Sequence, residues 1–418
     1  MPWRQCDGRL GRIAMDRADV LILGGGLVGL ALASALDSSG LSAILIDPAD
    51  PEGRATQGFD GRTSAVSSSS TRMLEAIGVA DHFPEHGCPI RTIQVADGLQ
   101  PGGLAFEPED EEPLGVMHEN RHLRAALQAR AEAGRNLWLM WKSKPQSVDR
   151  AAHGVVVSLE DGRRLCAPVL AAVDGRNSPM REAAGIPMAR WKYDHMAVVS
   201  TLRHERPHDN IAYEIFYPTG PFALLPMTDD QKGHRSAIVW SVPMEDAAGW
   251  MSLTDEQFAG EAKATMGGFL GEIELAAPRS IYPLGFHHSA RMTDERLALV
   301  GDSAHAIHPI AGQGLNLGFR DAAAFAQVLV EGARLGLDLG DKQLLDRYQR
   351  WRSLDSLSVA VSTDSLTRVY GIPGKTASAV RRFGMRMIDR LGPIKNRLMS
   401  EARGTSGELP LLLRGLPI

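Results

Sequence analysis

Three glycines near the N-terminus, Gly24, Gly26 and Gly29, form a G-x-G-x-x-G pattern. The apolar run "ADVLILG" predicts a buried strand before them, and "LVGLALASALDSSG" predicts a helix after them. A second strand, "SAILID", ends in Asp47, about 20 residues further on. Gly24 permits the tight turn, Gly26 lets the backbone approach a pyrophosphate, and Gly29 lets helix and strand pack closely. The chain therefore contains a unit that binds a dinucleotide, with its phosphates at the helix N-terminus and its ribose hydroxyls on Asp47.

The same apolar run, residues 20–36, imitates a signal peptide or a membrane span, because basic residues precede it. Four glycines interrupt it, and it is short for a bilayer crossing. The nucleotide-binding unit explains it better. Residues 1–18 are expected to be a flexible extension, and residues 1–14 are alternatively upstream sequence ahead of a start at Met15.

Two later segments repeat the order strand, glycine turn, helix. In the first, residues 168–173 predict a strand, Asp174-Gly175 ends it, and Ser178 caps a short helix. In the second, "RLALV" predicts a strand, Gly301-Asp302 ends it, and "HPIAGQG" leads into a long amphipathic helix.

The second segment also suggests a metal site, because His305 and His308 are three residues apart and Asp302 is close. Pro309 disfavours a continuous helix there, and no third ligand follows at a convincing spacing. Gly312 and Gly314 favour backbone lying against a flat ring system instead, so we predict no metal.

The three motifs in this order resemble the flavoprotein aromatic hydroxylases like p-hydroxybenzoate hydroxylase. The last motif is most similar to the branch that hydroxylates the ring in ubiquinone biosynthesis. "DGRTSAVSSSS" (60–70), "ENRHLRAAL" (119–127) and the C-terminal "GELPLLLRG" are similar to that branch as well.

The resemblance implies FAD as the cofactor and assigns residues to it. Asp302 would bind the ribityl chain, Asp174-Gly175 would lie near the pyrophosphate, and Arg62 and Arg124 would reach the phosphates and ribityl region. Either arginine is alternatively a solvated surface residue, and Val148 is either at the adenine or in the core. The helix that begins near Leu315 and Asn316 would face the N1–C2=O edge of the flavin. The complete set of expected FAD residues is Gly24, Gly26, Val28, Gly29, Asp47, Arg62, Arg124, Val148, Asp174, Gly175, Gly301, Asp302, Pro309, Gly312, Gly314, Leu315 and Asn316.

The implied reaction is hydroxylation of the aromatic ring of a polyprenyl-phenol with O2, through a flavin C4a-hydroperoxide. Electrons would come from NAD(P)H or a ferredoxin-type donor, since a single G-x-G-x-x-G leaves no second dinucleotide unit evident. The catalytic residues stay unknown. Candidate bases are Tyr217, Tyr282, His287 and His288, each of which has an ordinary structural alternative.

The expected fold is α/β: a Rossmann-like FAD-binding domain interleaved with a β-sheet substrate domain, followed by C-terminal helices. The FAD domain would comprise residues 19–88, 110–185 and 284–343. The β domain would comprise residues 89–109 and 186–283, and the helical region residues 344–418. Phe222, Leu224, Pro226 and Trp240 are candidate pocket walls, with sheet core as the alternative for each.

Composition sets the remaining expectations. A formal net charge of −5 argues against nucleic acid as a partner, and three scattered cysteines argue for a reducing, cytoplasmic setting. Basic residues line the C-terminal segment, either beside a packing or oligomer face or at a peripheral membrane contact. They are Arg381, Arg382, Arg386, Arg390, Lys395 and Arg397.

Three functions therefore stand at this stage. The first is the ubiquinone-pathway monooxygenase. The second is a flavoprotein hydroxylase or oxidoreductase of a small soluble aromatic compound. The third is a non-catalytic FAD-binding scaffold. The expected partners also include a second copy of this chain, in a homo-oligomer, or a ubiquinone-biosynthesis complex.

Overall fold

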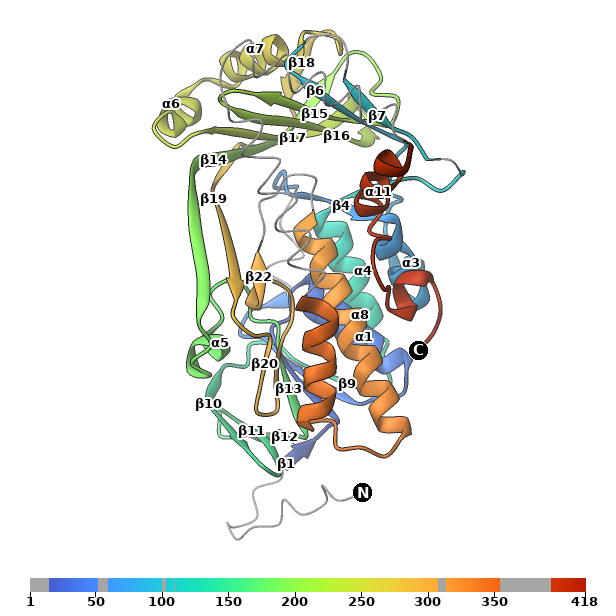
Figure 1. Cartoon of the computed structure of the whole chain (residues 1–418). Coiled ribbons are helices and arrows are strands. Elements are labelled where there is room, and N and C mark those ends of the chain that lie inside the picture. The colour runs from blue at the N-terminus through green and yellow to red at the C-terminus, as the bar shows by residue number, and fades with distance from the viewer. Residues whose placement is uncertain (1–14, 52–58, 100–102, 109, 307–312, 354–391) are drawn as a thin grey trace.

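The computed structural model describes residues 15–51, 59–99, 103–108, 110–306, 313–353 and 392–418, and these form four β-sheets (Figure 1). The six-stranded sheet has the order β20-β21-β13-β2-β3-β9 and is parallel except for the β20–β21 pair. Its strands are β2 (Val20–Leu23), β3 (Ala43–Ile46), β9 (Leu137–Met140), β13 (Val169–Ala172), β20 (Thr293–Asp294) and β21 (Leu297–Leu299). The dinucleotide-binding unit predicted from the glycines is therefore confirmed as β2, α1 (Leu27–Ser38) and β3.

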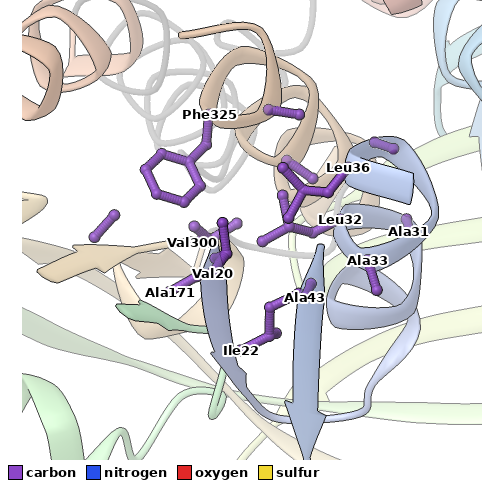
Figure 2. Packing of buried hydrophobic residues seen from close by; sticks show 14 of the residues in the cluster. Val20, Ile22, Ala31, Leu32, Ala33, Leu36, Ala43, Ala171, Val300 and Phe325 are labelled. Atoms are coloured by element: carbon purple, nitrogen blue, oxygen red, sulfur yellow. The ribbon is translucent and has the colours of Figure 1, made fainter. Parts of the chain in front are cut away.

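The core of this unit lies between its sheet and two long helices. Every residue of β2, β3, β13 and β21 is buried, as expected for parallel strands covered on both faces. Helix α1 and helix α8 (Gln313–Arg334) pack against one another beside the sheet. Figure 2 shows Leu32 and Leu36 of α1 and Phe325 of α8 around the strand that carries Val20.

A nine-stranded sheet forms the second layer of the molecule. Its strands are β6 (Thr92–Asp97), β7 (Leu104–Phe106), β14 (Met188–His204), β15 (Ile211–Tyr217), β16 (Gly220–Asp230), β17 (Gly233–Pro243), β18 (Ile273–Leu275), β19 (Ser280–Ser289) and β22 (His305–Ala306). Strand β6 pairs with β15, so a strand from residues 89–109, the first part of the expected β domain, lies in the same sheet as strands from residues 186–283. The mixed architecture of the expected fold class is confirmed with it.

Strands β14 and β19 connect the two layers. They pair over nearly the full length of β19, from Met188 opposite Ser289 to Val199 opposite Ser280. Their register shifts between Lys192 and Met196. In Figure 1 this pair runs from the nine-stranded sheet down to α5 (Pro179–Ala183), beside the six-stranded sheet. Because β19 extends to residue 289, the boundary expected at 283/284 falls inside a strand.

The remaining strands form two small sheets. One contains β1 (Met15–Arg17), β10 (Pro145–Ala151), β11 (Gly154–Leu159) and β12 (Arg164–Ala167), and the other contains β4 (Thr63–Ser67), β5 (Cys88–Ile90) and β8 (Gly115–Glu119). Strand β1 pairs in parallel with β12. The last residues of the expected flexible extension are therefore part of a sheet, since β12 supplies hydrogen-bond partners for their backbone.

Two helices interrupt the segment that was expected to be β-rich. They are α6 (Ala247–Ser252) and α7 (Asp255–Met266), and they cover one face of the nine-stranded sheet (Figure 1). Thr254 and Gln257 form a reciprocal capping box at the start of α7. That T-x-x-Q spacing was the sequence signal for this helix.

The remaining helical elements are α3 (Ser68–Ala76), η2 (Ala80–His82), α4 (Asn120–Glu132), η3 (Gly301–Ser303), helical residues 342–353, α11 (Gly392–Ala402) and η5 (Leu411–Arg414). Of the basic C-terminal residues named above, Lys395 and Arg397 lie on α11 and the other four lie outside the described residues. Met399 of α11 packs against residues of the nine-stranded sheet. None of the helices within the described ranges combines the length and apolar character needed to span a bilayer.

Candidate functional site

The glycine turn between β2 and α1 is held by very close backbone contacts. Gly24 has φ +112°, and a Cβ there would lie 2.2 Å from the carbonyl oxygen of Val173. A Cβ on Gly29 would lie 2.0 Å from the carbonyl oxygen of Gly24. Both positions therefore exclude any side chain, and both support the turn from inside the fold.

Gly26 has the opposite environment, because no atom lies within 4 Å of where its Cβ would be. It is the N-cap residue of α1, it has ordinary extended backbone, and it makes no side-chain cap. The first N–H groups of this 12-residue helix therefore open onto free space, where they and the helix dipole favour an anion.

Asp47 fixes the turn from the end of β3. Its Oδ2 atom accepts a hydrogen bond of 2.6 Å from the N–H of Gly25, and its Oδ1 atom accepts one of 2.7 Å from the N–H of Ala49. The side chain is buried. Both carboxylate oxygens are therefore engaged with backbone, and contact with a ribose stays a prediction.

A cavity of about 690 Å³ lies beside this turn. That volume is within the range of small-molecule and cofactor sites. One wall, the dinucleotide side, is formed by the glycine turn and by segments from β4, β13, η3 and α8, and the other wall is formed by the nine-stranded sheet. The lining includes Gly26, Leu27, Val28, Arg62, Val173, Gly175, Arg176, Asp302, Gly314 and Leu315 from the first side, and Ala197, Val199, Glu214, Pro221, Ala223, Leu225, Val239, Ser241 and Tyr282 from the second.

The structure thus brings seven of the expected FAD residues together on the cavity wall: Gly26, Val28, Arg62, Gly175, Asp302, Gly314 and Leu315. Arg62 also pairs with Asp60 at 2.6 Å and is more than half exposed, so its alternative as a surface arginine stays open. Arg124 lies behind the glycine turn, with Nη1 3.5 Å from the carbonyl oxygen of Gly25. Pro309 and Gly312 lie outside the described residues.

Val148 is separated from these residues. It lies on β10 in the four-stranded sheet and packs against the main hydrophobic core, and the cavity lining does not include it. Of its two interpretations, the placement favours a core valine.

Asp302 presents its carboxyl group to the cavity from η3. The side chain is accessible from the cavity, while the surrounding protein withdraws it from bulk water and raises its pKa. Arg176, which also lines the cavity, opposes that rise. The ring Nε2 of His287 lies 2.8 Å from the carbonyl oxygen of Asp302 and fixes its peptide group.

Asp321, about two turns into α8, holds the other side of the same segment. Its Oδ2 atom accepts a hydrogen bond of 2.9 Å from the N–H of Gly301 and lies 2.8 Å from Nε2 of His305. Its Oδ1 atom accepts one of 2.7 Å from Nε of Arg352. Burial alone would raise the pKa of Asp321, but His305 and Arg352 outweigh it and lower the pKa to about 2.

This pairing gives His305 a structural role that the sequence did not reveal. His308 lies outside the described residues, and within the described ones no cluster of three or more His, Cys, Asp or Glu side chains has the arrangement of a metal site. Asn316 also supports the site from behind. Its Oδ1 atom accepts from the N–H of Ser67, and its Nδ2 donates to the carbonyl oxygen of Ala65, each at 2.9 Å.

Asp174 lies between two cavity residues, Val173 and Gly175. Its Oδ2 atom accepts a hydrogen bond of 3.2 Å from the N–H of Met180 at the start of α5. Burial raises its pKa, although hydrogen bonds to Ser178 and Met180 oppose the rise. The predicted Ser178 cap is confirmed, since its hydroxyl accepts from the N–H of Arg181 at 3.0 Å.

The expected substrate-pocket walls require a correction. Phe222, Leu224 and Trp240 are buried on the face of the sheet that packs against α7, in a cluster with Phe258. Their neighbours in sequence face the cavity instead, because successive side chains of a strand alternate between the two faces. Ala223, Leu225, Val239 and Ser241 therefore replace them. Pro226 is also absent from the lining.

Of the four candidate bases, Tyr282 lines the cavity. The Tyr217 hydroxyl donates to the carbonyl oxygen of Thr265 on the α7 side of the sheet. His287 is occupied with Asp302, and burial lowers its pKa to about 4. His288 is partly buried, and burial lowers its pKa too.

Sequence reasoning missed Glu214, which lines the cavity from β15. Burial raises the pKa of this carboxyl group to about 7. A signal existed, because Ala212 and Phe216, two residues to either side, are buried on the same face. A charged residue between them is out of place in a strand covered on both faces.

The residues on the dinucleotide side fit FAD. Uncapped helix N–H groups at Gly26 suit a pyrophosphate. At Gly175 and Gly314, as at Gly26, no atom lies within 4 Å of where a Cβ would be. At these three positions of the wall a cofactor can therefore approach the backbone closely. The Asp302 carboxyl group offers an acceptor for hydroxyl groups.

Comparison with known proteins agrees with this geometry. A family model described as "FAD binding domain" matches residues 17–359. This chain belongs to that FAD-binding family.

Its relatives include hydroxylases of ubiquinone synthesis. The chain is 40% identical over 405 residues to the protein named ubiquinone hydroxylase UbiL of Rhodospirillum rubrum, which covers 96% of this chain and 94% of the relative. It is 30% identical to the human protein named ubiquinone biosynthesis monooxygenase COQ6, mitochondrial, with 92% of each chain covered. The family resemblance seen in the motifs is thereby confirmed.

Solved structures share the fold. PqsL of Pseudomonas aeruginosa, in complex with 2-aminobenzoylacetate, matches with a TM-score of 0.75 at 22% identity, covering 88% of this chain and all of that one. p-Nitrophenol 4-monooxygenase PnpA of Pseudomonas putida matches with a TM-score of 0.75 at 16% identity, covering 94% of this chain and all of that one.

Proposed function

We propose that this flavoprotein is a monooxygenase that hydroxylates the aromatic ring of a polyprenyl-phenol intermediate in ubiquinone biosynthesis, using O2. The observation that carries the proposal is the 40% identity to a ubiquinone hydroxylase along 96% of this chain. The cavity agrees with it, since a polar dinucleotide side faces a largely apolar sheet that suits an aromatic ring.

FAD, when bound, would supply the oxygen-activating chemistry. The chain's own residues would bind and orient the reactants. The α1 N-terminus at Gly26 would hold the pyrophosphate and Asp302 would hold the ribityl hydroxyls. Ala223, Leu225 and Val239 would place the ring against the flavin and keep water away from it. Electrons would come from NAD(P)H or from a ferredoxin-type donor.

The test is rescue of a bacterial mutant that lacks ubiquinone because a ring hydroxylase is deleted. Expression of this chain is expected to restore ubiquinone and to remove the accumulated phenol, as identified by mass spectrometry. Purified protein is expected to carry FAD in a ratio of about one per chain. Protein that purifies with FAD but rescues nothing, and that hydroxylates a small soluble phenol, would support the second candidate function instead.

The apolar tail of such a substrate partitions into membranes, so we further propose a peripheral membrane contact and an association with other enzymes of the pathway. Flotation with anionic liposomes checks the contact. Protein that stays at the bottom of the gradient with and without Lys395 and Arg397 contradicts it.

A further inference from the structure

Glu214 interrupts an otherwise apolar row of side chains across the nine-stranded sheet. On β15 it lies opposite Val95 of β6 and Ala223 of β16. The row continues through Val239 of β17 to Val199 of β14. Glu214, Ala223, Val239 and Val199 all line the cavity. Glu214 is therefore the one ionisable group in this row, and it faces the space where a ring would lie.

The carboxyl group has no partner among the described residues: no hydrogen bond or ion pair joins it to another side chain or to the backbone. Burial is the sole cause of its raised pKa, and no neighbouring charge contributes. Asp97 follows Val95 on the same side of β6. The other titratable groups on the cavity wall are Arg62, Arg176, Tyr282 and Asp302. The Glu214 side chain is partly accessible from the cavity, while the surrounding protein withdraws it from bulk water. Because a carboxylate in such a place is unfavourable without a hydrogen-bond donor, Glu214 is suited to a ligand that brings one.

We propose that Glu214 accepts the hydrogen bond, and during the reaction the proton, of the phenolic hydroxyl group of the substrate. This assignment rests on the proposed function. Proton transfer converts the carboxylate to a neutral acid and the phenol to a phenolate, whose ring carbons are more electron-rich and react faster with an electrophilic oxygen. The ring carbon bonds to the oxygen supplied by the O2-derived oxidant of the proposed function, and the bond from that oxygen to the rest of the oxidant breaks, with the electron pair staying on the departing group. When the ring becomes aromatic again its own proton leaves and, by way of solvent, neutralises the departing group. The acid then returns the first proton to the phenolate oxygen. The carboxylate is then regenerated.

The pKa values of the Glu214 carboxyl group and of a phenol are compatible with general-base catalysis by Glu214. A carboxyl group with a pKa of about 7 is mostly ionised at pH 8. A phenol has a pKa near 10. Complete transfer before oxygen attack would occur in about one molecule in a thousand, given about three pKa units between the groups. Transfer in step with oxygen attack avoids that limit, and general bases of this kind contribute about 10²-fold or more to rates.

A binding experiment tests the contact without turnover. The probes are 2-geranylphenol and its methyl ether, titrated at pH 8 into the FAD-loaded protein and followed by the flavin absorbance. The wild type is expected to bind the phenol about tenfold more tightly than the ether, because only the phenol donates a hydrogen bond to the carboxylate. Glu214→Gln is expected to remove most of that preference. An equal preference in both proteins would overturn the proposal.

The second measurement is the pH dependence of hydroxylation of 2-geranylphenol. The wild-type rate is expected to rise as pH passes about 7 and then level off, since the base must be ionised. In Glu214→Gln the rate is expected to be about 10²-fold lower, without this rise. Glu214→Asp is expected to regain part of the rate and the rise with pH.

Glu261→Gln is the matched control, because Glu261 is exposed on α7 and far from the cavity lining. It is expected to behave as the wild type. Retained FAD in Glu214→Gln shows that the variant is folded. A variant that hydroxylates with the wild-type pH profile would overturn the role of Glu214 and leave the proposed function intact. A wild type that prefers the phenol but does not hydroxylate it would contradict the proposed function and leave Glu214 as the hydroxyl-binding residue.

Discussion

Asp302 and Asp321 are carboxylates of one segment with opposite electrostatics. The cavity side chain, Asp302, has a raised pKa because the surrounding protein withdraws it from water. Asp321 is buried more completely, yet Arg352 and His305 lower its pKa to about 2. Asp321 therefore fixes the backbone of Gly301 permanently, whereas Asp302 keeps its hydrogen-bonding capacity for a ligand.

We expect Asp302→Ala to weaken FAD binding about tenfold to a hundredfold, because it removes a charge-assisted acceptor for a hydroxyl group. Fluorescence of released FAD measures the dissociation constant. Asp302→Asn is the matched variant, and it should lose less because its amide oxygen still accepts. FAD affinity that is unchanged in both would remove Asp302 from the cofactor site.

The metal alternative is checked on the same preparation. Treatment with EDTA is expected to leave hydroxylation unchanged, since His305 is engaged with Asp321. Activity that is lost on chelation and restored by an added divalent metal would contradict the flavin interpretation of this segment.

At the scale of elements, the turn between β2 and α1 allows a paired prediction. Gly24→Ala is expected to destabilise the fold by roughly 2 kcal/mol or more, since φ is +112° and the new Cβ meets the Val173 carbonyl oxygen. Gly26→Ala is expected to change stability by less than about 1 kcal/mol, since its Cβ meets nothing. It should nevertheless weaken FAD binding, because the methyl group enters the space at the helix N-terminus.

Chemical denaturation measures the first effect and FAD titration measures the second. Each variant is the control for the other, because both changes add one methyl group to the same turn. The prediction is wrong if the two variants lose stability and FAD affinity in the same proportion.

Elements were more predictable than the faces they present. The motifs around Gly24, Asp174 and Gly301 located β2, α1, β3, β13, β21 and α8, because turn chemistry and apolar runs are local properties. The face of the sheet on which Phe222 and Trp240 lie could not be predicted from local sequence. Both faces of β16 and β17 carry apolar residues, so alternation could not tell the side covered by α7 from the side facing the cavity.

At the scale of the whole molecule, buried neutral histidines make stability depend on pH. Burial lowers the pKa values of His287 and His118 to about 4 each. An unfolded histidine has a pKa near 6.5. Between about pH 6.5 and pH 4 these histidines are therefore protonated in the unfolded chain but remain neutral in the folded chain. The free energy of unfolding is therefore expected to fall as pH decreases through this window, by on the order of 3 kcal/mol for each histidine.

Urea denaturation at pH 7.5 and pH 5 measures this loss. His287→Gln keeps an N–H donor for the Asp302 carbonyl oxygen but cannot titrate, so its stability should decline less between the two pH values. A decline equal to that of the wild type would show that other groups control acid sensitivity.

Contacts between residues far apart in the sequence could not be predicted from the sequence. The interleaving of the two layers was expected, because residues 89–109 were assigned to the β domain. The pairing of Asp321 with Arg352 does not follow from local pattern, and the alternation that makes Glu214 unusual in its strand does not reveal that it faces a cavity. Both depend on segments that meet only in the folded chain.

The strand order of the six-stranded sheet also determines how late in synthesis the fold can be completed. Strand β13 lies between β2 and β21, so residues 20–23 and 297–299 belong to one six-stranded sheet. At about 5–20 residues per second, a ribosome needs roughly 15 to 60 seconds to proceed from the first of these strands to the last. During that interval β13 lacks its neighbour β21, and α1 lacks helix α8, which begins only at Gln313. The nascent chain is therefore a client for chaperones until nearly three hundred residues have emerged, and overexpression without them should favour inclusion bodies.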